Sequence, residues 1–259
     1  MSRQTDTHRP TRVFRLIQFS DCHVSAKPAR YRGCDARAGF EKVLETALDG
    51  SPDLLLGTGD MSEDHSEASY GYLGERLQKT GVPFVTVPGN HDEPWLQQRL
   101  LGPCPVDEPL VVAAGAWQVI ALNSAVHGEI PGALSRHMLD GLVAALDASL
   151  KPKAIFLHHQ PLPVGSPWID RYPLREPERL WRVLEGRRQV RLVAWGHIHQ
   201  PFAAMRGGIS LLGAPSTAAN SVPAREKFML DERGPACRWF ELQESGGFRT
   251  GILGPGWPA

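Results

Sequence analysis

Five short segments of the chain carry histidine, aspartate and asparagine side chains in combinations that are typical of metal sites. The segments are FSDCHV with Asp21 and His23, GTGD with Asp60, PGNHD with Asn90, His91 and Asp92, FLHHQP with His158 and His159, and AWGHIHQP with His197 and His199. Imidazole nitrogens suit iron, zinc and manganese, whereas carboxylate and carbonyl oxygens suit harder ions. The mixed set therefore indicates first-row transition metals rather than calcium, and it needs no thiolate.

Taken singly, each of these residues has an ordinary structural explanation. An aspartate after a strand is usually a helix N-cap or a turn residue, and a lone histidine is more often a surface or core residue than a ligand. The order of the segments favours a shared function, because each follows an apolar run that is typical of a buried strand. Six of the ten histidines of the chain lie in these segments, which makes one common site the better hypothesis.

The first third of the chain predicts parallel strands joined by helices. Val13–Phe19 and Pro52–Thr58 are expected to be buried strands. The helix between them is indicated by apolar residues at helical spacing, namely Phe40, Val43, Leu44, Ala47 and Leu48. A second helix over Glu67–Gln78 precedes a third strand at Pro83–Val87, so this part is expected to be doubly wound.

The remainder predicts a second set of strands. The expected elements are a hairpin of Leu110–Ala113 and Trp117–Leu122, a helix over Leu139–Leu150, strands at Lys153–Leu157 and Val190–Trp195, a helix over Glu178–Leu184, and mostly β-structure from Phe202 to Ile252. Two sheets packed between outer helices would accommodate these elements. Because ligands bind at the carboxyl ends of strands in α/β sheets, the five polar segments are expected to converge in one cleft.

Length and charge limit the possible classes of protein. A chain of 259 residues with 42% hydrophobic content is expected to form one domain over residues 1–259, with residues 1–12 as a flexible tail. The 28 basic and 28 acidic residues balance, so no strong field is expected toward nucleic acid or a membrane. With no signal peptide, no spanning segment and four scattered cysteines, a cytoplasmic protein with reduced thiols is expected; its oligomeric state is not encoded.

Other catalytic classes find no support in the sequence. It contains no G-x-x-x-x-G-K-[ST], H-E-x-x-H or G-x-S-x-G motif. No cysteine is followed six residues later by the arginine that a cysteine-dependent phosphatase loop needs. A covalent nucleophile is therefore not expected.

The five segments, as an ordered set, resemble the motifs of the calcineurin-like metallophosphoesterases. They extend from Asp21 to His199, which is about two thirds of the chain. The resemblance implies an α/β (α+β) fold of the metallophosphoesterase type, a four-layer αββα sandwich in which two mixed β-sheets are flanked by helices. It also implies two metal ions at the strand ends, in agreement with the elements predicted above.

The resemblance also assigns ligands to the two ions. One ion is expected on Asp21, His23 and His199 and the other on Asn90, His158 and His197, with Asp60 bridging both. Iron and manganese are the expected metals, with zinc and cobalt as alternatives. A bridging carboxylate links cations about 3.5–4 Å apart, and the ions lower the pKa of bound water, so a metal-bound hydroxide is the implied nucleophile. Two divalent ions outweigh Asp21, Asp60 and one hydroxide in charge, so the site is expected to attract an anionic phosphate ester.

The family pattern leaves His91 off the metals and close to the phosphate. This position implies transition-state stabilisation, or protonation of the leaving oxygen directly or through water. Substrate contacts are expected from Asn90, His91 and His199. Asp92 either orients His91 or is only a turn or cap residue, and the sequence leaves both open.

Two further residues beside the ligands have competing interpretations. His158 and His159 compete for one ligand position; His158 is preferred because it directly follows the strand and fits the H-H-x-P form of the motif, which leaves His159 a supporting position. Cys22 lies between two ligands, but alternation along a strand is expected to point it away from them. An inert buried thiol is then more plausible than a redox sensor.

Four longer segments narrow the resemblance. LHHQPLPVGSPWID, GHIHQ, GAPSTAANSVP and PACRWFEL are similar to the class III 3',5'-cyclic AMP phosphodiesterases of bacteria. The implied reaction is hydrolysis of 3',5'-cyclic AMP to 5'-AMP. Arg175-Glu176 and AANSVP depart from that pattern, and both lie where the nucleoside could be contacted.

Base recognition is expected from the loop Pro161–Arg175 and the segment Pro215–Pro223. There, Trp168 or Tyr172 either stacks on adenine or simply packs the loop. Two other functions remain open, a broad phosphodiesterase or phosphomonoesterase acting on another small phosphate ester, and a metal-binding scaffold without catalysis. The presence of all seven expected ligands and of His91 favours an enzyme over a scaffold.

Overall fold

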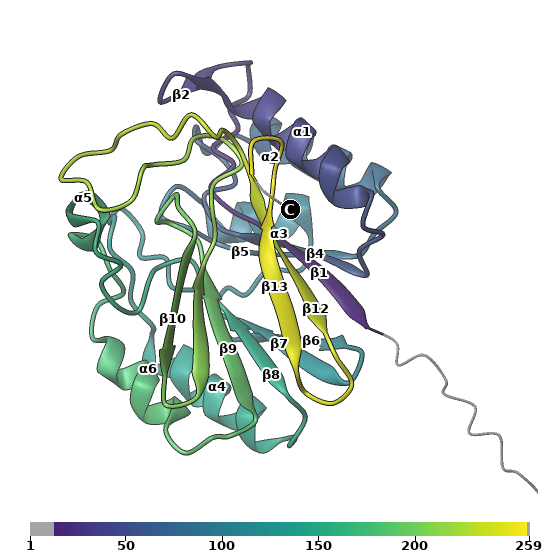
Figure 1. Cartoon of the computed structure of the whole chain (residues 1–259), viewed down its shortest axis with the longest axis vertical. Helices are drawn as coiled ribbons and strands as arrows, with labels where there is room; N and C mark the ends of the chain where they lie inside the picture. Colours follow the sequence, from purple (N-terminus) through teal and green to yellow (C-terminus); the bar gives the residue numbers. More distant parts are fainter. Residues whose placement is uncertain (1–12, 258–259) are drawn as a thin grey trace, which may run out of the picture.

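The computed structural model describes residues 13–257 and is built on two β-sheets (Figure 1). The first sheet has the strand order β13-β12-β1-β4-β5. Its strands are β1 (Phe14–Phe19), β4 (Leu54–Thr58), β5 (Phe84–Val87), β12 (Cys237–Leu242) and β13 (Phe248–Leu253). β1, β4 and β5 run parallel to one another, whereas β12 is antiparallel to both β1 and β13, so the sheet is mixed.

The second sheet has six strands in the order β10-β11-β9-β8-β7-β6. These are β6 (Leu110–Ala114), β7 (Trp117–Ala121), β8 (Lys153–Phe156), β9 (Val190–Trp195), β10 (Phe202–Arg206) and β11 (Ile209–Gly213). The central strands β7, β8, β9 and β11 are parallel, and the two edge strands are antiparallel to their neighbours. A separate two-stranded hairpin, β2 (Arg30–Tyr31) and β3 (Cys34–Asp35), stands outside both sheets.

Side-chain alternation along the strands places the sheets in the middle of four layers. In β1, Leu16 packs in a cluster between the sheets, whereas Ile17 packs against the first three helices. In β8, Phe156 lies between the sheets and Ile155 faces the later helices. The helices are α1 (Ala36–Leu48), α2 (Glu67–Lys79), α3 (Pro94–Leu101), α4 (Arg136–Asp147), α5 (Pro167–Asp170) and α6 (Pro177–Leu184). The predicted αββα sandwich is therefore confirmed.

Local sequence signals explain where the helices begin. Asp35 caps α1 by accepting a hydrogen bond from the amide of Ala38 at 3.0 Å, and Ser66 caps α2 through the amide of Ser69 at 3.1 Å. α3 and α6 begin with a proline in the first turn, where the missing amide proton has no helical partner to lose. Each helix then buries its apolar face on a sheet.

Most predicted elements are confirmed, and a few predictions were wrong at their ends. The expectation of a doubly wound first part was also wrong, because α1, α2 and α3 all cover one face of the first sheet and the second sheet covers the other. The expected helix over Leu139–Leu150 runs instead over α4, and Leu150 is 89% exposed beyond its end. The expected β-structure from Phe202 to Ile252 is interrupted by residues 214–236, which hold neither a helix nor a named strand. The predicted tail over residues 1–12 lies outside the described residues. Among residues 13–257, no helix has the length and apolar character that crossing a bilayer requires.

Candidate metal centre

The two sheets bring their polar strand ends together. Asp21 and His23 follow β1, Asp60 follows β4, Asn90 follows β5, His158 follows β8, and His197 and His199 follow β9. Parallel strands in a sheet end at the same edge, which is why side chains so far apart in sequence can meet. The seven residues predicted as ligands thus lie in one cluster, where six are almost completely buried and Asn90 is partly exposed.

The first expected ligand group is compact. Nε2 of His199 lies 3.2 Å from Oδ1 of Asp21 and 3.3 Å from Nε2 of His23. Nδ1 of His199 is 2.7 Å from the carbonyl oxygen of Ala219, and Nδ1 of His23 is 2.7 Å from the carboxylate of Glu63. These oxygens accept, so each Nδ1 donates its proton and each Nε2 turns a lone pair toward the cluster.

In the second expected group, each histidine likewise turns one ring nitrogen toward the cluster and donates its other N–H to an oxygen atom. Nε2 of His158 lies 3.2 Å from Oδ1 of Asn90 and 3.1 Å from Nδ1 of His197. Nδ1 of His158 donates to the carbonyl oxygen of Thr58 at 2.7 Å, and Nε2 of His197 donates to that of Tyr172 at 3.0 Å. The nitrogen that faces the cluster is therefore Nε2 in His158 and Nδ1 in His197.

Asp60 lies between the two groups. Its Oδ2 is 3.7 Å from Nε2 of His23 in the first group, and its Oδ1 is 3.4 Å from Nε2 of His158 in the second. Gly89 allows this close arrangement, because a Cβ there would collide with Oδ1 of Asp60. One carboxylate therefore faces both groups, as a bridging ligand must.

The charges of these side chains suit cations. Burial opposes ionisation of Asp21, but the nearby histidines, His199 and then His158, together outweigh it and lower the pKa of Asp21 to about 2. Burial also opposes the charge on Asp60, yet His158 and the other nearby histidines keep its pKa well below the usual range. Burial, followed by the proximity of His158, lowers the pKa of His197 to about 3, so its ring is neutral. Burial lowers the pKa of His158, but the carboxylate of Asp60 outweighs this effect and raises that pKa to about 9. An ion bound at Nε2 would displace the proton that Nε2 carries in the charged ring.

The donor set fits two transition-metal ions. Asp21 Oδ1 is buried without a hydrogen-bond partner, and buried polar atoms are rarely left in this state unless a ligand completes them. Imidazole lone pairs from four histidines point to the same region, together with two carboxylates and the amide oxygen of Asn90. Neutral imidazole nitrogen combined with a few oxygens suits iron, manganese, zinc or cobalt and not calcium.

The contacts of His159 separate it from His158. Nδ1 of His159 is 2.9 Å from the hydroxyl of Ser124, and Nε2 is 3.0 Å from the carbonyl oxygen of Ile130. Both ring nitrogens are occupied, so no lone pair remains for an ion, although the ring lies 4.8 Å from that of His158. Burial and the neighbouring His197 lower the pKa of His159, which keeps its ring neutral. The geometry therefore favours His158 as the ligand.

Five of the expected ligands adopt a backbone conformation that few residues other than glycine adopt. The φ angles lie between 45° and 65° for Asp21, His23, Asp60, His197 and His199. Left-handed backbone costs free energy in a residue with a Cβ, and such strain is concentrated at functional sites. No sequence signal predicted this feature, although the Gly59-Asp60 and Gly196-His197 pairs mark tight turns.

Glu63 is a site residue that the sequence interpretation missed. Its Oε2 lies 2.7 Å from Nδ1 of His23 and 3.3 Å from Nδ1 of His91, so one carboxylate faces an expected ligand and the expected proton donor. The amide of His91 donates to Oδ1 of Asp60 at 2.8 Å, and its side chain is 35% exposed. His91 thus lies at the rim of the cluster, where it can reach a bound molecule. The signal that could have identified Glu63 is its position three residues after Asp60.

The carboxylate of Asp92 supports the loops that follow β4 and β5. Its carboxylate accepts hydrogen bonds from the amides of Met61, Ser62 and Gly89 and from the hydroxyl of Tyr70, at 2.9–3.1 Å. These bonds tie the turn after β4 to the turn after β5. Of the two interpretations left open by the sequence, the contacts favour a turn residue. Burial and the charge of Asp60 raise the pKa of Asp92 to about 6.

The orientation predicted for Cys22 is confirmed. The side chain is completely buried and packs with Phe40 and Val43 beneath α1, with its sulfur 4.0 Å from that of Met61. Burial raises the pKa of this thiol to about 12. Cys22 therefore contributes packing and no ligand atom.

The two aromatic residues expected to contact a base differ in their relation to the cluster. The ring of Trp168 lies 6.1 Å from that of His199, whereas Tyr172 contacts His197 through its backbone oxygen and packs against the core of the second sheet and its helices. Arg175 forms an ion pair with Glu129 at the surface, and Glu176 precedes α6 with φ of 46°. Of the two aromatic candidates, only Trp168 lies beside a ligand ring.

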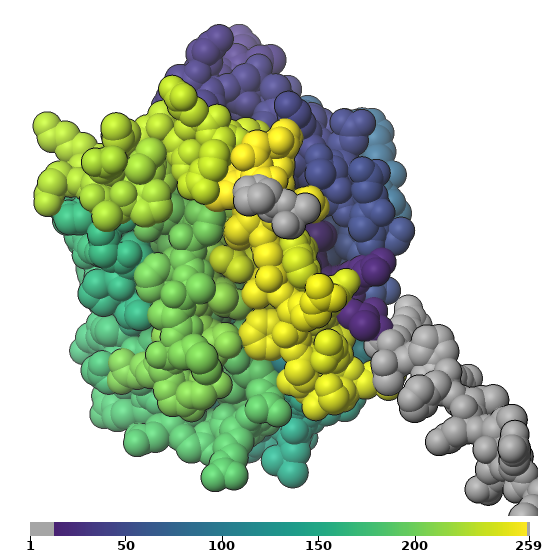
Figure 2. Space-filling view, in the orientation of Figure 1, coloured from purple at the N-terminus to yellow at the C-terminus, as the bar shows by residue number. Residues whose placement is uncertain are grey.

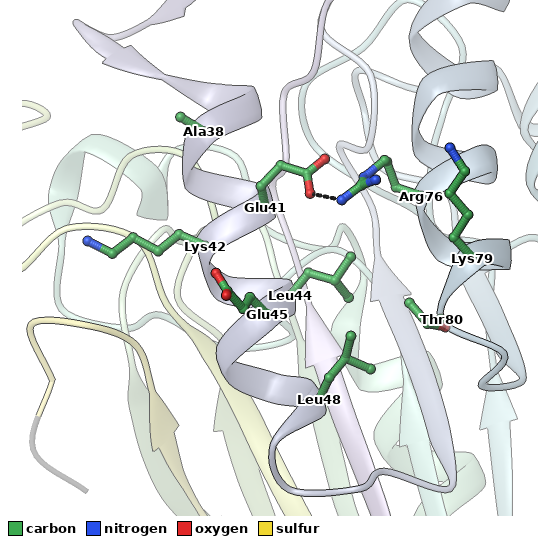
Figure 3. Close-up of a pocket in the computed structure, with 9 residues that line it drawn as sticks. All are labelled: Ala38, Glu41, Lys42, Leu44, Glu45, Leu48, Arg76, Lys79 and Thr80. Carbon is green, nitrogen blue, oxygen red and sulfur yellow. Dashed lines mark hydrogen bonds and ion pairs between the residues drawn. The ribbon is translucent and has the colours of Figure 1, made fainter.

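A groove elsewhere on the molecule contains none of the expected ligands. A groove of about 680 Å³ lies between α1 and α2, where Glu41 faces Arg76 across it (Figure 3). Its floor is formed by Leu44 and Leu48, and its walls carry both acidic and basic side chains. None of the expected site residues lines this groove, so it is not the site of the predicted chemistry.

Comparisons with known proteins agree with the geometry. A family model described as calcineurin-like phosphoesterase matches residues 14–201. The 3',5'-cyclic adenosine monophosphate phosphodiesterase CpdA of Pseudomonas aeruginosa is 38% identical over 256 residues, which cover 97% of this chain and 94% of that protein. The protein of the same name from Escherichia coli K12 is 33% identical over 243 residues, covering 92% of this chain and 88% of that protein.

Solved structures show the same fold at lower identity. A dimetal phosphatase from Danio rerio superposes with a TM-score of 0.69 at 15% identity, covering 92% of this chain and 98% of that one. This likeness concerns the fold alone, whereas the family model extends over all five polar segments. The chain therefore belongs to the calcineurin-like phosphoesterase family.

Proposed function

We propose that this protein is a metal-dependent phosphodiesterase that hydrolyses 3',5'-cyclic AMP to 5'-AMP. The observation that carries the proposal is the pair of ligand groups joined by Asp60, which provides a place for two cations at the end of both sheets. Two relatives named as cyclic AMP phosphodiesterases, 38% and 33% identical over nearly the whole chain, support the choice of substrate.

The ligand assignment is part of this proposal. One ion is assigned to Asp21, His23 and His199, the other to Asn90, His158 and His197, and Asp60 is shared. Iron and manganese are proposed, with zinc or cobalt as alternatives, because imidazole and carboxylate together accept all four. When bound, the two ions bind phosphate oxygens and lower the pKa of water, which supplies a nucleophile at neutral pH.

The side chains around the ions would position and protonate the substrate. Asn90 and His199 lie in different ligand groups, so a phosphate held across both groups contacts both side chains. His91 stands at the rim, where it can stabilise charge on the phosphoryl oxygens and donate a proton to the leaving 3'-oxygen. Oε2 of Glu63 lies 3.3 Å from Nδ1 of His91, which leaves Nε2 for the substrate.

The charge balance supports a diester substrate. Only two carboxylates, Asp21 and Asp60, belong to the proposed ligands, so two cations leave a modest excess of positive charge. A cyclic nucleotide carries one negative charge, and a modestly positive site can bind it without trapping the dianionic product. Because the formal net charge of the chain is zero, we propose a small-molecule substrate and no binding to nucleic acid or membranes. We also propose that the chain forms one domain and is cytoplasmic.

The experiment that tests the proposal compares three substrates on metal-replete enzyme. The kcat/KM for cyclic AMP is measured beside those for bis(p-nitrophenyl) phosphate and a phosphomonoester. Cyclic AMP is expected to be hydrolysed with the highest kcat/KM, and the artificial diester to be cleaved as well. Turnover of another ester but not of cyclic AMP would leave a broad phosphoesterase. Metal binding without any hydrolysis would leave a scaffold.

A further inference from the structure

Three aromatic side chains and one arginine gather beside the first ligand group. They come from the β2–β3 hairpin, from α5 and from the segment 222–230, and we call them the aromatic cluster. Its members are Tyr31, Arg32, Trp168 and Phe228. The three rings are partly buried and Arg32 is exposed, whereas the ligand rings beside them are almost completely buried. The cluster thus extends from the ligands to the surface.

The rings of the cluster contact the ligand histidines directly. Tyr31 stacks on His23 with ring centroids 3.7 Å apart and planes 8° from parallel. Trp168 and Phe228 stand edge-on to His199 at 6.1 and 6.2 Å, and they lie 5.3 Å from each other. A phosphate ester on the ions would have its organic group within reach of these rings.

Arg32 lies over the cluster. Its guanidinium carbon is 4.2 Å from the ring centroid of Phe228, and 5.5 and 5.7 Å from those of Tyr31 and Trp168. Its Nε donates to the hydroxyl of Tyr31 at 3.2 Å. An exposed guanidinium with spare donors beside aromatic faces can stack on a planar ring and bind its acceptors.

The fold holds these segments together. The amide of Ala224 donates to the hydroxyl of Ser166 at 2.9 Å, and the amide of Trp168 donates to the carbonyl oxygen of Arg225 at 3.4 Å. The segment 222–230 is thereby fixed to the start of α5. Figure 2 shows this segment, in yellow-green, at the surface beside the purple hairpin region. Three distant parts of the sequence therefore build one wall of the site.

We infer that the aromatic cluster is the subsite for the base of a nucleotide. Phe228 and Trp168 provide faces and edges for stacking, and Arg32 moves off the Phe228 ring to cover the base and donate to its ring nitrogens. Tyr31 joins the subsite to the first ligand group through His23. The inference rests on the proposed function, and it adds Tyr31, Arg32 and Phe228 to the residues that select the substrate.

A pair of inhibitors that differ only in the base tests this subsite. Inhibition constants for 5'-AMP and ribose 5-phosphate are measured on the metal-replete enzyme, with hydrolysis of bis(p-nitrophenyl) phosphate as the reporter reaction. In the wild-type protein, 5'-AMP is expected to bind about tenfold more tightly or better, since stacking one base on aromatic side chains gives roughly that factor. In Phe228→Ala and Trp168→Leu the ratio should fall by about tenfold, with the constant for ribose 5-phosphate unchanged. In Arg32→Ala the ratio should fall about threefold.

Two matched variants serve as controls. Arg206→Ala removes another arginine that lies over an aromatic ring, 4.7 Å from Trp181, and Trp95→Ala removes an aromatic ring that is 66% exposed on α3. Neither should change the ratio, and all variants should keep the wild-type Tm and metal content. Equal binding of the two inhibitors by the wild-type protein, an unchanged ratio in Phe228→Ala, or a lost ratio in Trp95→Ala would each overturn the inference. Failure to hydrolyse cyclic AMP, with the ratio still dependent on the cluster, would refute the proposed function and leave the subsite standing.

Discussion

The two sheets hold their histidines at the centre in different ways. The three expected ligands that follow β8 and β9 each donate their outer N–H to a backbone carbonyl oxygen. On the side of the first sheet, His23 and His91 both face the single carboxylate of Glu63. One side is therefore oriented by the main chain and the other by a side chain that is 35% exposed.

The difference indicates which histidine rings depend for their orientation on a single replaceable side chain. A backbone carbonyl keeps its place whatever side chain its residue carries, so the orientation of His158, His197 and His199 is fixed by the fold. A carboxylate can be replaced by a single substitution, and it adds a negative charge that strengthens its hydrogen bonds. The first-sheet side is therefore expected to respond to substitutions of its supporting residue, and the second-sheet side to resist them.

The largest effect is expected where the two sides share a ligand. Asp60→Ala should lower kcat/KM by about three orders of magnitude or more and reduce metal content, because both ions lose an anionic ligand. The measurement combines metal analysis with steady-state kinetics on cyclic AMP. Asp140→Ala, on the exposed face of α4, is the control. Near-normal turnover by a fully metallated Asp60→Ala protein would refute the shared-ligand assignment.

The next effect separates catalysis from metal binding on the first-sheet side. His91→Ala should keep both metals and the wild-type Tm and lose roughly 10²–10⁴-fold in kcat, as expected when one acid or transition-state donor is removed. His127→Ala, an exposed histidine, should leave kcat unchanged. If His91→Ala lost its metals, His91 would be a ligand and its proposed role wrong.

A smaller effect should follow from removing the carboxylate that the two histidines share. Glu63→Ala should lower kcat/KM for cyclic AMP by about 10–100-fold, the usual range for a residue that orients ligands. The loss should be smaller for bis(p-nitrophenyl) phosphate, because nitrophenolate leaves without a proton. Glu63→Gln should recover part of the activity, since its amide oxygen can still accept from Nδ1 of His23. Equal losses on both substrates would assign Glu63 to metal binding alone.

The sequence predicted the parts of the fold and site that depend on local pattern. Apolar runs identified the central strands, helical spacing identified α1, and the strand-end rule brought seven side chains into one cluster. The role of Glu63 was not predicted because it arises from a contact with His91, 28 positions away in the chain. The hairpin that carries Tyr31 was not predicted because strands of two residues are too short to show a hydrophobic pattern. Leu150 was misassigned because its spacing suits a helix that has already ended at Asp147.

The smallest effect is expected at Cys22, which tests whether first-sheet residues other than Glu63 influence the ligands. Its side chain is fully buried in the cluster beneath α1, with Phe40 and Val43. Cys22→Ala should change kcat/KM by less than about threefold and cost about 1 kcal/mol of unfolding free energy through lost packing. In a Cys34→Ser background, which removes the one cysteine that is not buried, a thiol reagent should leave the native protein unlabelled and fully active. Rapid labelling with loss of activity would mean that the first-sheet loop opens under native conditions, and that its ligands depend on more than the Glu63 carboxylate.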